Sequence, residues 1–130
     1  MARQMKELEN LAESVRTQLN LKYDAASVKF IEGFIERNKS NFDKEKSKGL
    51  INSLGSFLGQ CIIENYGGYW QLDNDTGSVA IVFDDNNKAY PFAKVSKQFD
   101  NGLEDSVYSF YSVIPTVFKL DKKKKPWWKF

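Results

Sequence analysis

The chain has 130 residues, of which 42% are apolar and 15% aromatic, enough to bury a core within one compact domain. It contains no histidine, which excludes catalytic groups and metal sites that depend on imidazole. It has a single cysteine, Cys61, which excludes intrachain disulfides and zinc clusters held by several cysteines. The net charge of +2 is unevenly distributed, because residues 119–130 carry six lysines and one aspartate, whereas acidic residues outnumber basic ones in the rest.

Three helices are predicted in the first half of the chain. Apolar residues recur every three or four positions from Met5 to Leu19, with charged residues between them, which is typical of an amphipathic helix. Asp24 is a suitable N-cap for a second helix that ends near Asn38. After a polar connection, residues 49–65 are the most apolar of the three segments, so we expect this helix to be central.

A small sheet is predicted next. Gly67 and Gly68 follow the third helix, where a helix end often needs a left-handed backbone conformation that glycine adopts without steric cost. Three β-rich runs then alternate with turns rich in aspartate and asparagine, which indicates an antiparallel three-stranded meander. These runs are residues 69–72, 78–83 and 88–92. We expect Trp70 to face the helices.

Two more helices are predicted after the sheet. Pro91 suits a first helical turn, and Asn101 with Gly102 provides a stop. The last helix is expected to begin at Leu103 and to end near Pro115.

The predicted fold class is therefore α+β, with N-terminal helices packed on a small antiparallel meander and C-terminal helices after it. Residues 1–118 form a single domain in this prediction, and residues 119–130 form a basic aromatic tail. The N-terminal segment is charged throughout and lacks the apolar run of a secretory or transmembrane segment, which favours a cytoplasmic protein.

The third predicted helix carries two features that invite a functional interpretation. Cys61 lies on its apolar side, which is typical of a buried, inert thiol rather than a nucleophile. Gly55 and Gly59 form a GxxxG pattern, and a glycine inside a helix costs on the order of 1 kcal/mol relative to alanine. We therefore expect another element to pack closely against these two glycines.

Paired carboxylates are the remaining catalytic option. Glu64 and Asp73 bracket the junction between helix and sheet and could flank a sugar, although some such pair is expected by chance among seventeen acidic residues. The stretch DNDTG is similar to part of a calcium loop, but Gly77 comes one place too early and an apolar strand follows. The sequence predicts no catalytic residue, no metal site and no cofactor.

The C-terminal tail, KLDKKKKPWWKF, combines a lysine cluster with aromatic rings. Such a segment suits an anionic lipid surface or single-stranded nucleic acid, and it could equally pack on the domain, stay solvated or bind a protein partner. Its candidate binding residues are Lys122, Lys123, Lys124, Lys125, Trp127 and Trp128.

Acidic residues occupy both turns of the predicted meander. These candidate binding residues are Asp73, Asp75, Asp84 and Asp85. If the two turns are neighbours, they form a negative patch that would steer association with a basic protein, including a cationic toxin. Acidic turns are also common solubilising features, so the patch has an ordinary explanation as well.

The run GLINSLGSFLGQCIIENYGGYW, the short sheet and PFAKVSKQFDNGLEDSVYSFY together resemble a class of small uncharacterised bacterial α+β proteins. The shared features are an LGxxLGxx(I/V) helix, a Gly-Gly-x-Trp joint and a Pro-Phe-x-x-Val-x-Lys element. The matching residues are Leu54, Gly55, Leu58, Gly59, Gly67, Gly68, Trp70, Pro91, Phe92, Val95, Lys97, Asn101, Gly102, Asp105 and Ser106. Some similar domains are immunity proteins against bacterial toxins, so the resemblance implies a fold and an expectation of toxin neutralisation, but no catalytic residue.

The sequence therefore predicts a non-catalytic protein-binding module, in its concrete version an immunity-type protein that neutralises a basic toxin. An adaptor that binds a membrane or nucleic acid through the tail is the alternative. A carboxylate-based hydrolase that uses Glu64 and Asp73 is a third hypothesis.

Overall fold

The computed structural model describes residues 2–118, which form an α+β fold with a three-stranded antiparallel sheet, as predicted. The helices of this part of the chain are α1 (Ala2–Gln18), α2 (Ala25–Asn38), α3 (Lys44–Tyr66), α4 (Pro91–Asn101) and α5 (Val107–Phe118), with short 3-10 turns η1 (Lys39–Asn41) and η2 (Gly102–Asp105). The strands are β1 (Tyr69–Leu72), β2 (Val79–Asp84) and β3 (Asn87–Ala89), in the order β1-β2-β3.

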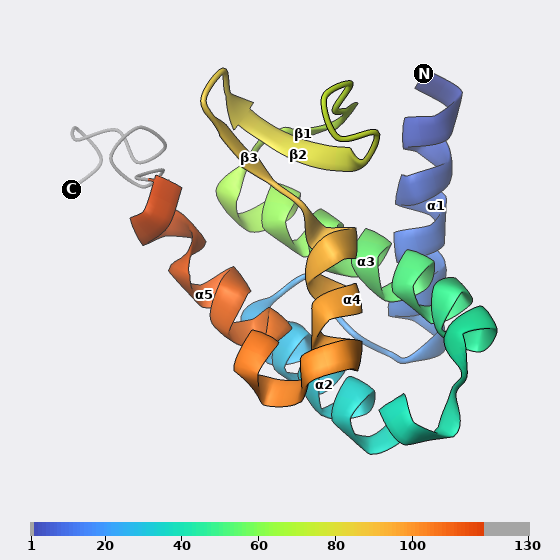
Figure 1. Cartoon of the computed structure of the whole chain (residues 1–130). Helices are drawn as coiled ribbons and strands as arrows, with labels where there is room; N and C mark the ends of the chain where they lie inside the picture. Colours follow the sequence, from blue (N-terminus) through green and yellow to red (C-terminus); the bar gives the residue numbers. More distant parts are fainter. Residues whose placement is uncertain (1, 119–130) are drawn as a thin grey trace.

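Helix α3 is the central element of the fold, as its apolar sequence predicts. Helices α1 and α4 pack along it, while α2 packs against α5. Figure 1 shows the sheet on one side of α3 and α2 on the other. The largest fully buried apolar side chains come from α2, α3, β2, α4 and α5: Val28, Ile31, Ile35, Leu54, Phe57, Leu58, Ile62, Ile81, Val95, Val107 and Ile114.

Side-chain caps decide where two of the helices begin. Asp24 caps α2, as predicted, by accepting a hydrogen bond from the backbone N–H of Ser27. Asp43 caps α3 in the same way through the N–H of Lys46, so α3 begins at Lys44. The predicted start at residue 49 was therefore too late. The first turn and a half of α3 is polar on every side, and a start inferred from apolar spacing misses it.

Helix α4 begins at Pro91, which occupies its first turn as predicted. Strand β3 therefore ends at Ala89, and the predicted third strand, residues 88–92, was too long. The last helix differs at both of its ends. Leu103 lies in the 3-10 turn η2, and α5 starts at Val107 and continues through Pro115 to Phe118.

Trp70 faces the helices, as predicted, and packs onto the glycine face of α3. It lies opposite Ile81 in the sheet and is only 6% exposed. A Cβ atom added at Gly59 would lie 2.1 Å from the indole Cη2, and one added at Gly55 would lie 2.4 Å from a ring carbon of Phe92. The two aromatic rings are 5.7 Å apart. The GxxxG pattern therefore admits an aromatic pair against the helix backbone, which confirms the predicted close packing.

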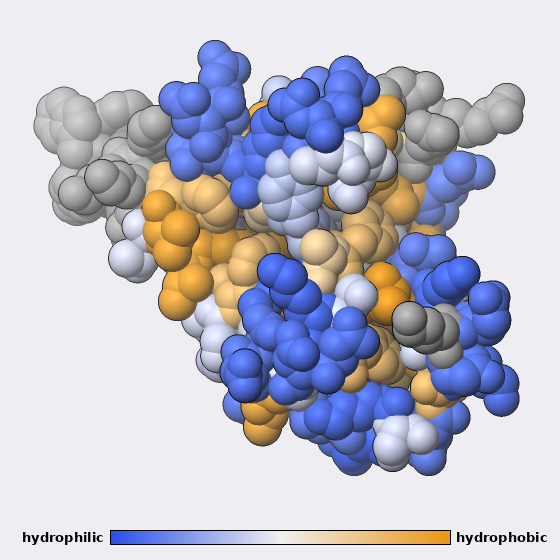
Figure 2. Space-filling model, in the orientation of Figure 1, coloured by the Kyte–Doolittle hydropathy of each residue, from blue (hydrophilic) through white to orange (hydrophobic). Residues whose placement is uncertain are grey.

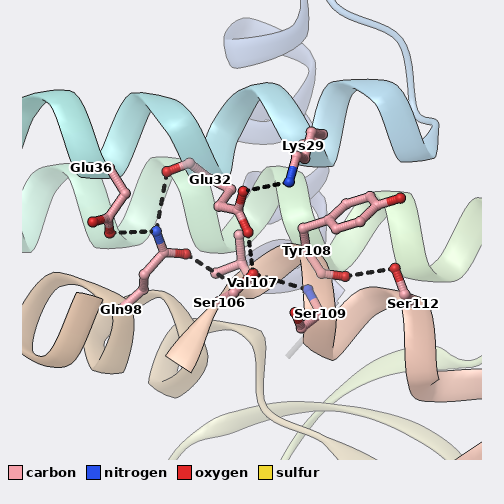
Figure 3. Close-up of polar contacts among 9 residues, drawn as sticks. All are labelled: Lys29, Glu32, Glu36, Gln98, Ser106, Val107, Tyr108, Ser109 and Ser112. Carbon is pink, nitrogen blue, oxygen red and sulfur yellow. Dashed lines mark hydrogen bonds and ion pairs between the residues drawn. The ribbon is translucent and has the colours of Figure 1, made fainter. Parts of the chain in front are cut away.

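A buried polar network joins α2 to the C-terminal helices (Figure 3). Gln98, which is fully buried, donates from its side-chain amide to the backbone carbonyl of Glu32 and to the carboxylate of Glu36. The hydroxyl of Ser106 donates to the Glu32 carboxylate and accepts the backbone N–H of Ser109, which caps α5. Each buried polar group in this network has a partner, as burial requires.

Candidate functional site

Asp73 organises the turn that connects β1 to β2. Its backbone N–H donates to the carbonyl of Ser78 at 2.8 Å, and its own carbonyl accepts from Gly77 at 2.7 Å. Its carboxylate accepts the backbone N–H of Asp75 and the hydroxyl of Tyr90. The carboxylate therefore closes its own turn and ties that turn to the start of α4.

The surroundings of Asp73 keep it ionised. The residue is only 6% exposed, and the hydrogen bond from Tyr90, followed by that from the Asp75 backbone, holds the pKa of its carboxyl below the usual range. The ammonium of Lys88 lies 3.8 Å away and favours the same charged form. A carboxyl with a lowered pKa is a poor proton donor near neutral pH, so this environment gives Asp73 the character of a fixed structural charge.

Glu64, the other half of the proposed carboxylate pair, has a different environment. Its exposed carboxylate accepts a hydrogen bond from Gln60 at 3.4 Å, and Gln60 in turn accepts from the indole N–H of Trp70. The cavity beside Asp73 is lined by residues 71–75 and Lys88, and Glu64 is not among them. Glu64 and Asp73 therefore do not share the cavity beside Asp73.

The two acidic turns lie at opposite ends of the sheet (Figure 1). Leu72 pairs with Val79 at one end of β2, next to the turn that holds Asp73 and Asp75. Asp84 pairs with Asn87 at the other end, next to Asp85. Five residue steps along β2 separate the two ends, which corresponds to about 17 Å. The four aspartates thus form two separate acidic groups.

Asp84 and Asp85 also differ in their environments. The carboxylate of Asp84 accepts hydrogen bonds from the backbone N–H of Asn86 at 2.9 Å and from the side-chain amide of Asn87. Asp85 is exposed at the tip of the turn. Asp84 therefore shapes its turn, as Asp73 does at the other end, and the exposed residues Asp75 and Asp85 present charge to solvent.

An apolar groove lies between α1 and the turn that connects β1 to β2. It has a volume of about 530 Å³, and its walls come from five elements and the connecting turn. The apolar lining residues are Met5, Leu8 and Leu11 of α1, Leu72 of β1, Val79 of β2 and Phe92 of α4. We call this feature the α1–hairpin groove.

Polar and acidic residues edge this groove. Glu7, Asn52 and Ser78 contribute to its walls, and Glu7 is exposed. Leu72 also lines the smaller cavity that contains Asp73 and Asp75, so the acidic turn adjoins the groove. The arrangement is an apolar depression with negative charge on its border.

The groove was not foreseen from the sequence, although some of its lining residues were. The apolar stripe of the first helix includes Met5 and Leu8, and periodicity alone predicts that the whole stripe is buried. In the structure Ala12 and Val15 are buried, whereas the stripe remains partly exposed toward the start of α1. The burial of this stripe depends on how far the sheet extends over α1, which the sequence does not show.

Cys61 is fully buried, as predicted. Burial, followed by the negative charge of Asp24, raises the pKa of its thiol far above the ordinary value, which removes the thiolate that a nucleophile requires. Within residues 2–118, no group of three or more cysteine, aspartate or glutamate side chains is arranged to hold a metal ion.

None of the helices described between residues 2 and 118 has the length and apolar character needed to cross a bilayer. The candidate tail residues, Lys122, Lys123, Lys124, Lys125, Trp127 and Trp128, lie outside the described residues.

No known protein family, curated protein or solved structure matches this chain. The similarity to small bacterial α+β proteins, and the toxin-neutralising role that it implies, therefore stay predictions.

Proposed function

We propose that this chain is a non-catalytic protein-binding module that receives an apolar side chain of a basic partner protein in the α1–hairpin groove. Neutralisation of a basic toxin is the concrete version of this function. The observation that carries the proposal is the groove itself, an apolar depression of about 530 Å³ whose border holds Glu7 and the turn of Asp75.

The shape of the groove suits an anchoring side chain. Protein partners commonly insert an aromatic or aliphatic residue into an apolar pocket near the centre of an interface. The groove offers the partly exposed side chains of Met5, Leu8 and Phe92, which gain from being covered because apolar surface is then removed from water.

The charge beside the groove suits a basic partner. Glu7 and Asp75 are exposed, and carboxylates at the rim of an interface steer a cationic protein toward it and raise the association rate. The chemistry of the described residues supports binding over catalysis, because Cys61 is buried and Asp73 is held by structural hydrogen bonds.

The test uses a partner captured by the full-length chain from its native cell, purified and titrated by calorimetry. We expect a complex of one partner per chain. Replacing Met5→Gln together with Glu7→Gln should weaken binding at least about tenfold, because both the apolar contact and the steering charge are lost. Glu9→Gln is the matched control, because Glu9 is exposed on the same helix but does not line the groove.

A second pair of variants distinguishes the two acidic turns. Asp75→Asn should weaken the complex, mainly through a slower association at low salt, whereas Asp85→Asn at the opposite end of β2 should leave it unchanged. If Asp85→Asn weakens binding and the groove variants do not, the contact surface is the turn between β2 and β3, and the groove proposal is wrong. A chain that ends at Leu120 should bind equally well, because the groove lies within the described domain.

A further inference from the structure

Strand β1 is an open edge of the sheet. The strand order β1-β2-β3 gives β1 a neighbour on one side only, and within residues 2–118 no other element runs alongside it. The strand at the other edge, β3, is short and carries Lys88, and a register shift between Val82 and Asp84 interrupts its pairing with β2. Such features discourage pairing with a further strand. β1 has none of them, because its sequence, YWQL, contains no charge and no proline and its register with β2 is regular.

The register of β1 shows which of its backbone groups face the open edge. Residue pairs of an antiparallel ladder alternate between pairs that exchange hydrogen bonds and pairs that do not. The backbone N–H of Asp73 donates to the carbonyl of Ser78 at 2.8 Å, which makes these two residues a hydrogen-bonded pair. The next pair along the ladder, Leu72 with Val79, is therefore not hydrogen-bonded. The N–H and C=O groups of Leu72, and those of Trp70 two residues away, consequently point away from β2. No backbone hydrogen bond outside the ladder involves these groups in the described chain.

The open edge is continuous with the α1–hairpin groove. Leu72 lines the groove with its side chain and faces the edge with its backbone. Residues that lie directly opposite each other on neighbouring strands direct their side chains to the same face of the sheet. A residue of an added strand opposite Leu72 would therefore point its side chain into the groove, toward Leu8 and Phe92. Strand pairing thus supplies a route by which an anchoring side chain reaches the groove.

Exposed carboxylates lie before and after β1. Glu64 precedes the strand, and Asp75 follows it in the turn to β2. Gln60 connects Glu64 to the strand, because its side chain hydrogen-bonds both the Glu64 carboxylate and the indole of Trp70. Figure 2 shows hydrophilic residues at the place that Figure 1 gives to the turn between β1 and β2. An added strand with basic residues at its ends would meet opposite charge at both.

The same charges disfavour a second copy of this chain as the added strand. Antiparallel pairing of β1 with β1 would bring the start of one strand beside the end of the other. Glu64 of one copy would then approach Asp75 of the other, and like charges facing each other across strands are destabilising. Charge complementarity therefore selects a basic segment.

We propose that the basic partner supplies an extended segment that pairs with the open edge of β1 and places an apolar side chain in the α1–hairpin groove. This inference rests on the proposed function and adds its binding mode. In β-strand addition, main-chain hydrogen bonds give affinity and alternate side chains give specificity. The segment carries an apolar residue opposite Leu72 and lysine or arginine on either side of it, toward Glu64 and Asp75.

Amide hydrogen exchange of the full chain, measured by NMR with and without the captured partner, tests the pairing. In the free chain the N–H groups of Trp70 and Leu72 should exchange faster than that of Gln71, which by the same alternation bonds to β2. Binding of the partner should slow exchange at Trp70 and Leu72 at least about tenfold, because their N–H groups gain acceptors. The amides of β3, at the other edge of the sheet, are the control and should not change.

A matched pair of variants separates the edge from the groove. Leu72→Ala and Leu72→Pro both remove the apolar side chain from the groove, but only proline also removes the N–H that faces the edge. Neither change removes a hydrogen bond to β2, and proline is tolerated on an edge strand where its missing N–H faces outward. Leu72→Pro should therefore bind the partner about fivefold more weakly than Leu72→Ala, which corresponds to one lost hydrogen bond. Circular dichroism establishes that each variant is folded.

A synthetic peptide tests the pairing without changing the chain. The partner segment that gains exchange protection in the complex is made as a peptide, which should compete with the partner. N-methylation of the alternate residues whose N–H groups face β1 should weaken its binding at least about tenfold, because their hydrogen bonds are lost. N-methylation of the intervening residues, whose N–H groups face away from β1, is the control and should have a much smaller effect.

The outcomes distinguish this inference from the proposed function. If Met5→Gln with Glu7→Gln weakens binding while exchange at Trp70 and Leu72 stays unchanged in the complex, the partner fills the groove without strand pairing, and only the inference is wrong. If exchange at Trp70 and Leu72 slows with the concentration of the chain alone, the edge pairs with a second copy, and the inference is again wrong. If no partner binds the chain, the proposed function fails and the inference fails with it.

Discussion

The side-chain carbonyl of Gln98 on α4 accepts the backbone N–H of Val107, the first residue of α5, at 2.9 Å. The amide nitrogen of the same side chain donates to the carbonyl of Glu32 and the carboxylate of Glu36 on α2. One buried glutamine therefore links three helices. Its partners on α2 lie more than sixty residues before it in the sequence.

Replacing Gln98→Ala should lower the free energy of unfolding by about 2–3 kcal/mol, because it leaves the N–H of Val107 and the carbonyl of Glu32 buried without these partners. Urea denaturation measures the change. Gln18→Ala, at the exposed end of α1, is the control and should stay within about 0.5 kcal/mol of the parent. If Gln98→Ala changes the free energy of unfolding as little as Gln18→Ala does, the network contributes little to stability.

Two glycines of α3 should respond to alanine in opposite directions. Gly59→Ala places a methyl group where the indole of Trp70 packs, so we expect a loss of about 1–3 kcal/mol through overpacking. Gly49→Ala meets no atom within 4 Å and should gain up to about 1 kcal/mol from helix propensity. Thermal unfolding of both variants gives the comparison. A stable Gly59→Ala protein would contradict the close contact of Trp70 with the helix.

Ser56 is fully buried in α3, and its hydroxyl makes no hydrogen bond within the described part of the chain. Ser56→Ala should therefore stabilise the protein by about 1 kcal/mol, because an unpaired buried hydroxyl is removed. Ser27→Ala is the contrasting variant, since the Ser27 hydroxyl accepts the N–H of Lys22 at 2.9 Å, and it should destabilise. Equal losses in both variants would indicate that Ser56 has a partner.

The hydrogen bond from Tyr90 to Asp73 should give stability a defined dependence on pH. The lowered pKa of Asp73 means that its contribution is present above the unfolded value of 3.8 and is lost as the pH falls through the folded pKa. The raised pKa of Tyr90 means that its contribution to stability is present below pH 10.0 and is lost as the pH rises through the pKa of the folded state.

Tyr90→Phe should therefore be less stable than the parent at neutral pH, and the difference should shrink below pH 3.8 and above pH 10.0. Unfolding by urea across this range provides the measurement. A difference that is constant with pH would mean that the phenol acts through packing alone.

Cys61 should resist a water-soluble thiol reagent in the native protein and react fully once the protein is unfolded by guanidinium. The physical reason is that its thiol is fully buried and its pKa is raised by that burial. The rate of labelling under native conditions then reports how often the core around α3 opens. Rapid native labelling would place the thiol near the surface and contradict the packing described.

The order and type of the elements followed from local patterns. The apolar spacing of residues 49–65 indicated the central helix, Asp24 indicated the start of α2, and Gly67 with Gly68 marked the change from helix to sheet. Both glycines have positive φ values, 88° and 93°, which other residues rarely adopt. These signals are visible in sequence because each depends on neighbouring residues only.

Element boundaries and the candidate site depended on longer-range contacts. The start of α5 follows from Ser106 and Gln98, whose partners lie on other helices or further along the chain. Asp73 was predicted as a binding residue of an acidic patch. In the structure its carboxylate contacts Tyr90 and Lys88, which follow β2 in the sequence, and these contacts give it a largely structural role. No local pattern could indicate those partners.

The sequence by itself determined the fold class, the burial of Cys61, the glycine face of α3 and the absence of histidine-based chemistry, because composition and short-range periodicity fix these properties. Only the tertiary structure decided that Tyr90 and Lys88 contact Asp73, that the start of α1 leaves an apolar groove, and that α5 exposes Val113 and Val117. A periodic apolar stripe states which face of an element prefers burial, and the lengths and positions of neighbouring elements decide how much of that face is covered.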